Sequence, residues 1–360
     1  MPTSPSPNRS LRCPACATEY ELSLSRVACE CGSPLDLVAE RRPLPRSLEG
    51  RAPGLSRYRE AIALADWSLE RAYLGAGMTP LVAMGGGLHA KCDFISPTGS
   101  FKDRGAAAVA AAALELGAVE VVVDSSGNAA AAVAAHAARA GLRATVVVPE
   151  GAPEAKLAQI RAYGTAVMLV RGPRERASQL AMDLSRHEGR YYASHAYNPF
   201  FLEGTRSWAF EIFEQLGAAP ETAVMPVGNG SLLLGVFAGF AHLVDSGLVT
   251  RMPRLVAVQS ENCAPLAGRP ARPLGHGLYT DGIAISKPVR ARAIRDAIVA
   301  SGGEVVVVSD AEVREARHWL AAAGLWVEPT AAAAWAAVSR PGKSEGHIVV
   351  NLGGAGFKCP

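Results

Sequence analysis

The chain has 360 residues, more than one ordinary hydrophobic core holds, so we expect two lobes and a small additional module. Hydrophobic residues make up 49% of it and charged residues 19%, the balance of a folded globular protein. A net charge of +3, with no apolar run of roughly 20 residues, predicts no nucleic-acid and no membrane partner. The N-terminus, rich in Pro and Ser, lacks the apolar stretch of a secretory signal, so we expect a disordered tail and a cytoplasmic protein.

Four of the seven cysteines form a cluster, in the motifs C-P-A-C and C-E-C-G: Cys13, Cys16, Cys29 and Cys31. In the cytoplasm such a cluster favours a metal over disulfides, and four thiolates suit a closed structural zinc site. The C-x-C half is less usual because its chelate turn is tighter, so a module without metal is the alternative. The remaining cysteines show no partner spacing: Cys92, Cys263 and Cys359. Residues 41–54, rich in Pro, Gly and Arg, have the composition of a linker.

From about Tyr58 onward, helical and strand-like segments alternate along the chain. In chain order we expect helix at 104–117, strand at 119–124, helix at 129–140, strand at 144–149, helix at 154–163, strand at 167–170, helix at 174–188, strand at 223–227, helix at 232–246, strands at 254–259 and 304–308, helix at 310–323 and strand at 347–352. This rhythm is typical of open α/β sheets with helices on both faces. Ligands of such sheets bind at the carboxyl ends of the strands.

Residues 96–105 read S-P-T-G-S-F-K-D-R-G, a turn-forming stretch that leads directly into the first of these helices. Lys102 therefore stands at a helix N-terminus, where the partial positive charge disfavours an ammonium group. A lysine that is easily neutralised is what an imine-forming nucleophile requires. Most lysines are solvated surface groups, and Lys102 alone does not exclude that alternative.

Two further loops join a strand to a helix. In D-S-S-G-N-A at 124–129, small residues leave backbone N–H groups free for an anion such as a substrate carboxylate, and Asn128 can donate to a phenolic oxygen. In P-V-G-N-G-S-L at 226–232, a nest of amides at a helix start suits a phosphate. Each loop taken alone is also compatible with an ordinary capped turn.

Together, the lysine and the two loops resemble the motifs of the fold type II family of pyridoxal-phosphate enzymes, and most of all those of threonine synthases. The segment G-A-G-M-T-P-L at 75–81 resembles the family's G-x-G-x-T-P-L, and V-E-P-T-A-A at 327–332 is similar to its V-E-P-A-S-A-A. The cysteine module resembles the N-terminal appendage of many members. The likeness covers nearly the whole chain after residue 11. It implies an α/β fold like that of tryptophan synthase β, with two interleaved lobes: a large one at 43–103 and 202–360 and a small one at 104–201, after an N-terminal part at 1–42.

The resemblance also implies a cofactor and residue roles. Pyridoxal 5'-phosphate would be held as a Schiff base on Lys102, which then serves as general base and acid, while the pyridine ring acts as the electron sink. Phe101 would flank the ring and Asn128 would bond its ring oxygen. The phosphate would be held by the glycine loop: Gly228, Asn229, Gly230, Ser231 and Leu232. Residues near the substrate would be Ser100, Ser125, Ser126 and Gly127.

The chain departs from threonine synthases where those enzymes grip the phosphate of their substrate. The family's arginine falls at Phe201, a helping serine at Ala196 and a threonine at Ala129, so that only Ser125 remains of this set. The threonine or serine that bonds the pyridine nitrogen falls at Gly353. The glycine loop reads G-N-G-S-L in place of G-N-x-G-N.

Three other residues near these motifs have simpler expected roles. His195 lies in the segment leading to the site and is a candidate substrate contact, with a locally hydrogen-bonded loop histidine as the alternative. Arg206 is the nearest basic residue that could replace the lost arginine, although we expect it on a solvated helix face. His136 is expected to be packed within its alanine-rich helix.

We therefore expect a homodimeric lyase or transferase that performs a β- or γ-elimination or replacement on an amino-acid substrate, one other than O-phosphohomoserine. The first alternative is a genuine threonine synthase that converts O-phosphohomoserine into threonine and phosphate. The second is a catalytically inactive binding protein that keeps the cofactor scaffold, for which Gly353 gives slight support. The sequence names neither the leaving group nor the nucleophile.

Overall fold

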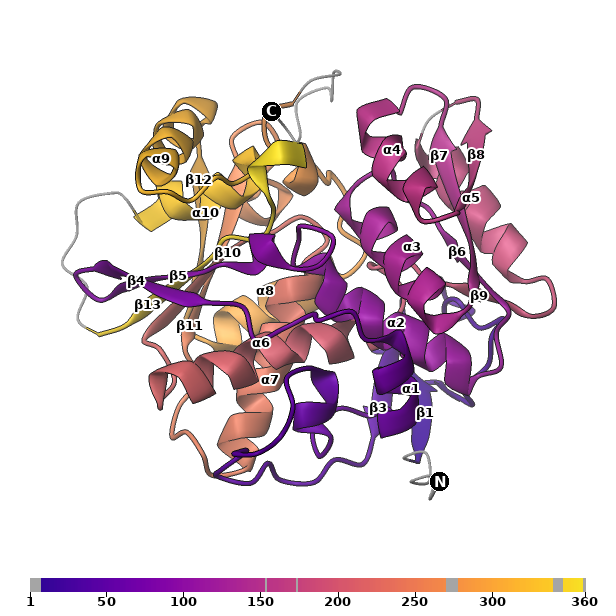
Figure 1. Ribbon diagram of the computed structural model, residues 1–360, viewed down its shortest axis with the longest axis horizontal. Coiled ribbons are helices and arrows are strands. Elements are labelled where there is room, and N and C mark those ends of the chain that lie inside the picture. The colour runs from indigo at the N-terminus through magenta and orange to yellow at the C-terminus, as the bar shows by residue number, and fades with distance from the viewer. Residues whose placement is uncertain (1–7, 153, 173, 270–277, 339–345, 359–360) are drawn as a thin grey trace. The chain divides into compact units, whose positions relative to one another are not determined.

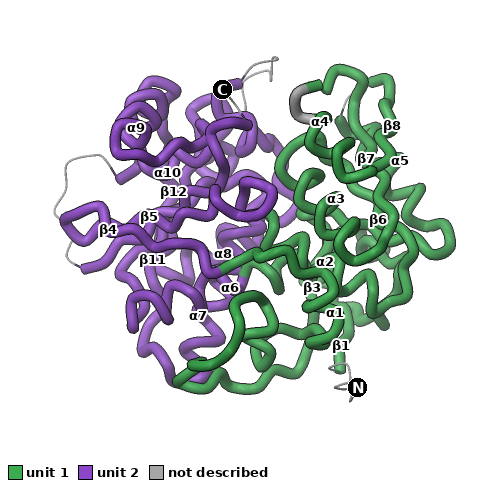
Figure 2. Tube along the Cα trace, viewed as in Figure 1, with its two compact units in different colours: residues 1–77, 102–205 green, residues 78–101, 206–360 purple. Residues whose placement is uncertain are grey.

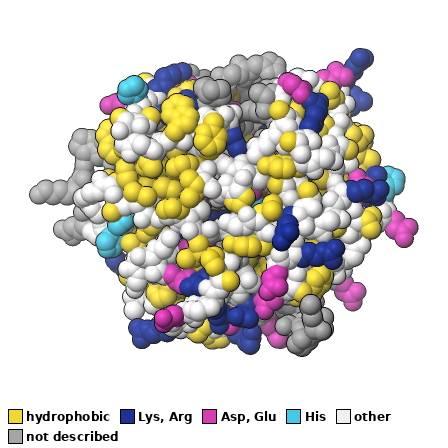
Figure 3. Space-filling model, in the orientation of Figure 1, with side chains coloured by type: hydrophobic (Ala, Val, Ile, Leu, Met, Phe, Trp, Pro, Cys, Tyr) yellow, Lys and Arg dark blue, Asp and Glu magenta, His cyan; other side chains and the backbone are white. Residues whose placement is uncertain are grey.

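The computed structural model describes residues 8–152, 154–172, 174–269, 278–338 and 346–358. Cys359 lies outside these ranges. Within them, no helix has both the length and the apolar character needed to cross a membrane. Basic and acidic side chains are interspersed on the face seen in Figure 3, in keeping with the small net charge.

The chain divides into two compact units, residues 1–77 with 102–205 and residues 78–101 with 206–360 (Figure 2). One boundary therefore falls between Phe101 and Lys102, and another falls inside a helix, between Thr205 and Arg206. The expected lobes placed residues 43–77 with the C-terminal half of the chain, whereas here they belong to the first unit. The reason is packing, because the helix Asp66–Ala72 lies against the two alanine-rich helices that follow residue 101.

The first unit contains a cysteine module, a parallel sheet and its helices. The elements are β1 (Arg9–Arg12), β2 (Glu19–Tyr20), β3 (Asp36–Ala39), α1 (Asp66–Ala72), α2 (Lys102–Glu115), β6 (Glu120–Val123), α3 (Asn128–Ala140), β7 (Arg143–Pro149), α4 (Glu154–Ala162), β8 (Ala166–Val170), α5 (Arg174–Ser185), β9 (Arg190–Tyr192) and the start of α6 (Phe200–Leu216). The module is an antiparallel sheet in the order β2-β1-β3, and the parallel sheet has the order β8-β7-β6-β9. Helices α3 and α5 cover opposite faces of the parallel sheet (Figure 1).

The second unit is built on a six-stranded sheet in the order β12-β11-β10-β13-β5-β4, parallel except for β4. Its elements are β4 (Leu81–Gly85), β5 (Leu88–Lys91), the rest of α6, β10 (Thr222–Pro226), α7 (Ser231–Asp245), β11 (Arg254–Ser260), α8 (Ala291–Ala300), β12 (Glu304–Val308), α9 (Asp310–Ala322), α10 (Pro329–Val338) and β13 (Ile348–Asn351). Its main core joins the sheet to α9 and α10 through buried aliphatic residues and Trp335.

Every helix and strand expected from the periodicity is present, with ends shifted by three residues or fewer. Gly141 ends α3 in the left-handed conformation that glycine adopts without strain, as expected. The expected linker at 41–54, however, is packed against the first unit. Arg41 donates to Glu203 at 2.7 Å, and Arg51 forms a two-pronged ion pair with Glu60 at 2.7 and 2.9 Å. Arg41 and Arg51 thus hold the segment within the unit, whereas Arg42 and Arg46 are exposed.

Candidate active site

Lys102 is the first residue of α2, as expected, and its side chain is half-buried. The rest of the helix is so rich in alanine that it packs closely against α3, and the residues following Lys102 are buried, including Asp103 and Arg104. His136 of α3 is fully buried, as expected, with Nε2 3.3 Å from Asp103 Oδ1 and Nδ1 2.7 Å from Ala72 O. The backbone of Lys102 therefore belongs to a tightly packed pair of helices, α2 and α3.

Phe201, where the family's phosphate-gripping arginine is expected, is fully buried at the start of α6. Lys102 Nζ lies 5.5 Å from the centroid of its ring. This is within the distance at which a cation is attracted to an aromatic face. The structure thus brings together the two residues, 99 positions apart in the chain, that the motifs placed in one site.

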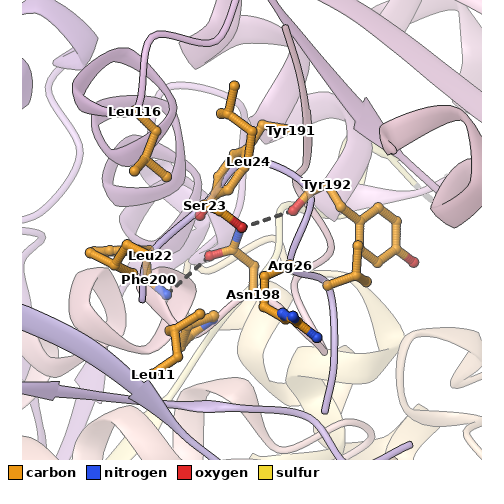
Figure 4. A pocket seen from close by; sticks show the side chains of 12 residues that line it. Leu11, Leu22, Ser23, Leu24, Arg26, Leu116, Tyr191, Tyr192, Asn198 and Phe200 are labelled. Carbon is orange, nitrogen blue, oxygen red and sulfur yellow. Dashed lines mark hydrogen bonds between the residues drawn. The ribbon is translucent and has the colours of Figure 1, made fainter. Parts of the chain in front are cut away.

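Asn198 sets the start of α6 through its side-chain amide. Figure 4 shows this amide between two segments of backbone. Nδ2 donates to Tyr192 O at 2.9 Å, and Oδ1 accepts from Phe200 N at 3.0 Å. The pocket drawn there lies between the cysteine module and the first unit's body and is lined by residues such as Leu11, Leu22 and Arg26. Lys102 is not among the residues that line this pocket, so the pocket is not the substrate site.

Two glycines let the ring of Phe201 approach α2. A Cβ placed on Gly105 would overlap this ring, and one placed on Gly204 would overlap the backbone carbonyl of Arg104. The second glycine brings the backbones of α2 and α6 into contact, and the first leaves the space that the ring fills. Neither glycine has a role that could be predicted from the sequence, where Gly105 is one letter of the lysine motif.

The loops after β6 and β9 lie at the same edge of the first unit's sheet, because these strands are parallel neighbours. One loop carries Ser125, Ser126 and Gly127, all half-buried, and the other carries His195 and Ala196. Between them, Asp124 accepts hydrogen bonds from Ser178 Oγ at 2.5 Å and Tyr192 OH at 2.8 Å, which fixes the first loop to α5 and β9. This role of Asp124 was not predicted from the sequence.

His195 also contacts Phe201, with ring centroids 6.0 Å apart in an edge-on arrangement. Burial lowers the pKa of His195 well below its usual value, and the nearby positive charges of Lys102 and Arg174 lower this pKa further. The histidine is therefore neutral at physiological pH. A neutral ring adds no positive charge beside Lys102 that could attract a substrate phosphate.

Arg206 does not lie on a solvated helix face, contrary to the expectation. Its side chain is buried, and Nη2 donates to Ala238 O at 3.2 Å. It falls in the second unit, where Gly239 of α7 packs against its backbone. The whole stretch of α6 around Arg206, residues 203–212, is buried although several of its side chains are polar.

The second unit carries the glycine loop at the carboxyl end of β10, as expected. Gly230 has a φ of 74°, a conformation that disfavours any residue with a Cβ, and Ser231 begins α7. A Cβ on Gly228 would lie 3.0 Å from Ile285 Cγ1. Both glycines thus leave the backbone of the loop uncovered by side chains, and α7 begins directly after the loop.

Residues 100–101 lie beside residues 353–354 in the same unit. Ser100 pairs with Gly354 in an antiparallel bridge, and Phe101 N donates to Gly353 O at 2.9 Å. An ideal Cβ on Gly353 would meet the Phe101 ring at 3.0 Å and Asn351 Oδ1 at 2.7 Å. Phe101 and Gly353, each of which was expected at the cofactor ring, are therefore in contact with one another.

The four clustered cysteines also come together in the structure. Their sulfur atoms lie within 4.8 Å of one another, with Cys13 Sγ 3.5 Å from Cys31 Sγ and Cys16 Sγ 3.5 Å from Cys29 Sγ. Tetrahedral coordination with metal–sulfur bonds of about 2.3 Å places the sulfurs about 3.8 Å apart. The cluster therefore has the size of a four-thiolate metal site.

Comparison with known proteins defines the class. Residues 72–354 match the family described as pyridoxal-phosphate dependent enzyme. The fold is similar to that of a threonine deaminase from T.th., with 26% identity, a TM-score of 0.67 and coverage of 80% of this chain and 96% of that one. It is also similar to that of O-ureido-L-serine synthase, with 26% identity, a TM-score of 0.64 and coverage of 81% and 92%. The chain therefore belongs to the family of pyridoxal-phosphate-dependent enzymes and has their type II fold, as expected.

Within this family, the chain is similar to proteins named threonine synthase. That of Methanocaldococcus jannaschii is 32% identical over 352 residues, covering 91% of this chain and 86% of the relative. That of Synechocystis is 36% identical over 276 residues, covering 75% and 72%. The resemblance to threonine synthases found in the motifs thus extends over most of the chain.

The residues of the second unit fit the family's cofactor. Several buried polar atoms of this unit have no hydrogen-bond partner among the described residues, and two of them, Ser100 Oγ and Asn351 Oδ1, belong to segments that adjoin Gly353. Buried polar groups are rarely left unpaired, so these atoms indicate a polar ligand at this end of the sheet. The amide-lined glycine loop follows β10, which is the hydrogen-bonded neighbour of β13, and it suits the phosphate of such a ligand.

Proposed function

We propose that this protein is a pyridoxal-phosphate-dependent lyase or transferase that performs a β- or γ-elimination or replacement on an amino acid without a distal phosphate. The observation that carries the proposal is Phe201, a buried phenyl ring 5.5 Å from Lys102 Nζ, in the place where the family's motif has a phosphate-binding arginine. When bound, the cofactor supplies an electron sink for negative charge at the substrate's Cα.

The protein's own groups have separate tasks in this proposal. Lys102 anchors the cofactor and moves the proton at the substrate's Cα. The backbone amides of the loop with Ser125, Ser126 and Gly127 bind the substrate carboxylate, while Asn128 donates to the cofactor's ring oxygen. The loop 228–232 holds the phosphate of the cofactor. Phe201 and Ala196, both buried, supply no charged or hydroxyl donor for a distal phosphate of the substrate.

The assignment of Lys102 is tested by borohydride reduction of the purified, cofactor-loaded protein, followed by peptide mass spectrometry. We expect a yellow protein in which Lys102 carries the reduced cofactor. Lys102→Ala should lose this link while keeping the fold, and Lys287→Ala, a change at an exposed lysine, should keep it. A borohydride-reducible link that persists in Lys102→Ala would contradict the assignment.

A second candidate is threonine synthesis from O-phosphohomoserine, which is favoured by the names of the relatives at 32–36% identity. The two candidates differ in whether the site binds a second phosphate. A dianionic phosphate that leaves water needs charge-assisted donors, usually from an arginine. At the three positions of this set, the chain has Phe201, Ala196 and Ala129, all buried and apolar.

We further propose that the four-cysteine cluster holds one structural zinc and that the enzyme works as a homodimer in the cytoplasm. The sulfur separations support the zinc. The dimer and the location rest on the resemblance to the family. Size-exclusion chromatography with light scattering tests the dimer.

A further inference from the structure

Asn351, the last residue of β13, has its side-chain orientation fixed by a buried carboxylate. Its Nδ2 donates to Asp93 Oδ2 at 2.9 Å, and the other carboxylate oxygen of Asp93 accepts from Thr79 Oγ1 at 2.7 Å. All three side chains are buried. Because only the nitrogen of the amide can donate to a carboxylate, the carbonyl oxygen Oδ1 must point away from Asp93.

This carbonyl oxygen has no hydrogen-bond donor among the residues that the structure describes. It lies beside Gly353, where an ideal Cβ would be only 2.7 Å away. Residues two apart in an extended chain project to the same side, so the missing side chain at Gly353 leaves the space that the amide of Asn351 faces. A buried acceptor of this kind requires a donor, and the ring of Phe101 on the other side of Gly353 offers none.

Asn351 lies at the carboxyl end of β13, on the side of the sheet where the cofactor is proposed to bind. β13 is hydrogen-bonded to β10, whose carboxyl end leads into Gly228 and the glycine loop. Asn351 and that loop are thus at the carboxyl ends of adjacent parallel strands, where ligands of such sheets bind. Ser100 Oγ, another unpaired buried atom in a segment that adjoins Gly353, is a hydroxyl that can donate or accept, whereas Asn351 Oδ1 can only accept.

We propose that Asn351 Oδ1 accepts a hydrogen bond from the pyridine nitrogen of the cofactor and thereby holds this nitrogen in its protonated form. The inference rests on the proposed function, since it requires bound cofactor. An amide oxygen carries no proton, so it can bond the ring nitrogen only when that nitrogen is an N–H donor. Asp93, by accepting from the amide's nitrogen, polarises the amide and makes Oδ1 a stronger acceptor. A protonated ring withdraws electrons more strongly from the substrate's Cα.

The test is nitrogen-15 NMR of the holoenzyme loaded with cofactor that is labelled at the ring nitrogen. In the native protein at neutral pH we expect a ring-nitrogen signal shifted to the protonated position, with one-bond coupling to a proton. Asn351→Leu, similar in shape but without an acceptor, should shift the signal to the unprotonated position. Asn351→Ser provides a second variant in case the leucine is not tolerated, because its hydroxyl can donate to an unprotonated nitrogen.

A matched control is Gln259→Leu, which also replaces a fully buried amide of this unit, one whose oxygen and nitrogen are both hydrogen-bonded within the protein. Its ring-nitrogen signal should stay in the protonated position. An unprotonated nitrogen in the native holoenzyme would overturn the inference, as would a protonated nitrogen in both Asn351 variants. A protein that binds no cofactor at Lys102 would instead contradict the proposed function, and borohydride labelling detects that case separately.

Discussion

A single side chain, Phe201, separates the two candidate functions at the scale of the residue. The ring is buried, and two polar groups that lie against it are Lys102 and a histidine that burial keeps neutral. A phosphate placed here would leave water and gain no arginine in return. Each charge-assisted hydrogen bond that is lost weakens binding by about 1.5–3 kcal/mol. The native enzyme should therefore convert O-phosphohomoserine with a kcat/KM well below about 10⁴ M⁻¹s⁻¹.

We predict that Phe201→Arg raises the affinity for phosphorylated amino acids by about 10- to 150-fold, the equivalent of one charged hydrogen bond. The measurement is the spectral titration of the holoenzyme with O-phosphohomoserine, alongside steady-state release of threonine and phosphate. Phe201→Leu is the control, because it opens the same space without a charge and should give no gain. Equal affinities of the arginine and leucine variants would mean that the register through 198–204 is incorrect. A native kcat/KM within the ordinary enzyme range would favour the threonine synthase candidate.

The sequence allowed the lysine and the apolar substitutions to be predicted because they lie inside motifs with fixed spacing. The partners of these residues could not be predicted in the same way. Asn351 is followed two residues later by Gly353, and only the structure shows that its amide faces the space beside that glycine. Arg206 is polar by composition, yet its burial depends on how α6 packs on α7, which no local pattern encodes.

At the scale of the element, the glycine loop combines two demands on the same backbone. It must leave amides open to a phosphate, and it must pass close to other parts of its unit. Gly230 has a positive φ, and a Cβ there would overlap Ile294. Side chains at these glycines are therefore excluded by the protein itself as well as by the proposed ligand.

We predict that Gly228→Val and Gly230→Val each weaken cofactor binding at least about tenfold, because the added side chain displaces the loop. Fluorescence or absorbance titration of the apoprotein with pyridoxal phosphate measures this affinity. Asn229→Ala should have a smaller effect, since the proposed contacts use backbone amides. Melting temperatures of the apoproteins separate a general loss of stability from a loss of binding. Unchanged affinity in both valine variants would place the phosphate elsewhere.

The cysteine module is the second element with a specific expectation. Metal analysis of protein that was purified without any chelator should find one zinc per chain. Cys29→Ser should release it, whereas Cys263→Ser, a change at a buried cysteine outside the cluster, should not. The imine chemistry requires no Lewis acid, so metal removal should lower the stability of the module and leave the cofactor link intact. Well under one zinc per chain in the native protein would refute this prediction.

The elements themselves were largely predictable, because the alternation of β-branched runs and alanine-rich stretches is strong in β6, α3 and β7. Four kinds of element were not predicted: the edge hairpin β4–β5, the three-residue strand β9, the helices α1, α6, α8 and α10, and the small strands of the module. The short strands contain too few residues to show a period of two. In α6, nearly every position is apolar or buried, so the helical period of hydrophobicity is blurred.

At the scale of the whole molecule, an ion pair buried in the second unit joins its sheet to α6. Lys91 Nζ lies 2.8 Å from Glu211 Oε2, with side-chain exposures of 0% and 1%. The ammonium group also donates to Thr79 O at 2.7 Å and Gln215 Oε1 at 2.9 Å. A buried pair of this kind requires both partners, because removal of one leaves an uncompensated charge in a medium of low polarity.

We predict that Lys91→Met lowers the free energy of unfolding by about 3–5 kcal/mol. The double variant Lys91→Met with Glu211→Leu should recover much of this loss, because no isolated charge remains. Urea unfolding of the holoenzyme, followed by circular dichroism, measures both. A double variant that is no more stable than the single one would contradict this prediction.

The division into two units was only partly predictable from the sequence. A boundary between the lobes was expected close to Lys102, after residue 103, and the structure has one directly before Lys102. The membership of residues 43–77 was not predictable, because it depends on long-range contacts: the packing of α1 on α2 and α3, and the hydrogen bonds of Glu203. This carboxylate accepts from Arg41 Nη2 at 2.7 Å and from Ala63 N at 2.9 Å and so ties the segment to the first unit. Such long-range partners, 162 and 140 residues apart in the chain, leave no local signal.

The fit of the Phe201 ring against Gly105 has a consequence for the order in which this site can evolve. A larger side chain at Gly105 would collide with the ring, whereas a smaller one at Phe201 would first free the space for it. The two positions are therefore epistatic: changes at 201 are permissive for changes at 105, and the reverse order passes through a variant in which the two side chains overlap. Directed evolution toward other substrates should recover active variants from libraries that vary position 201 first, and few from those that begin at 105.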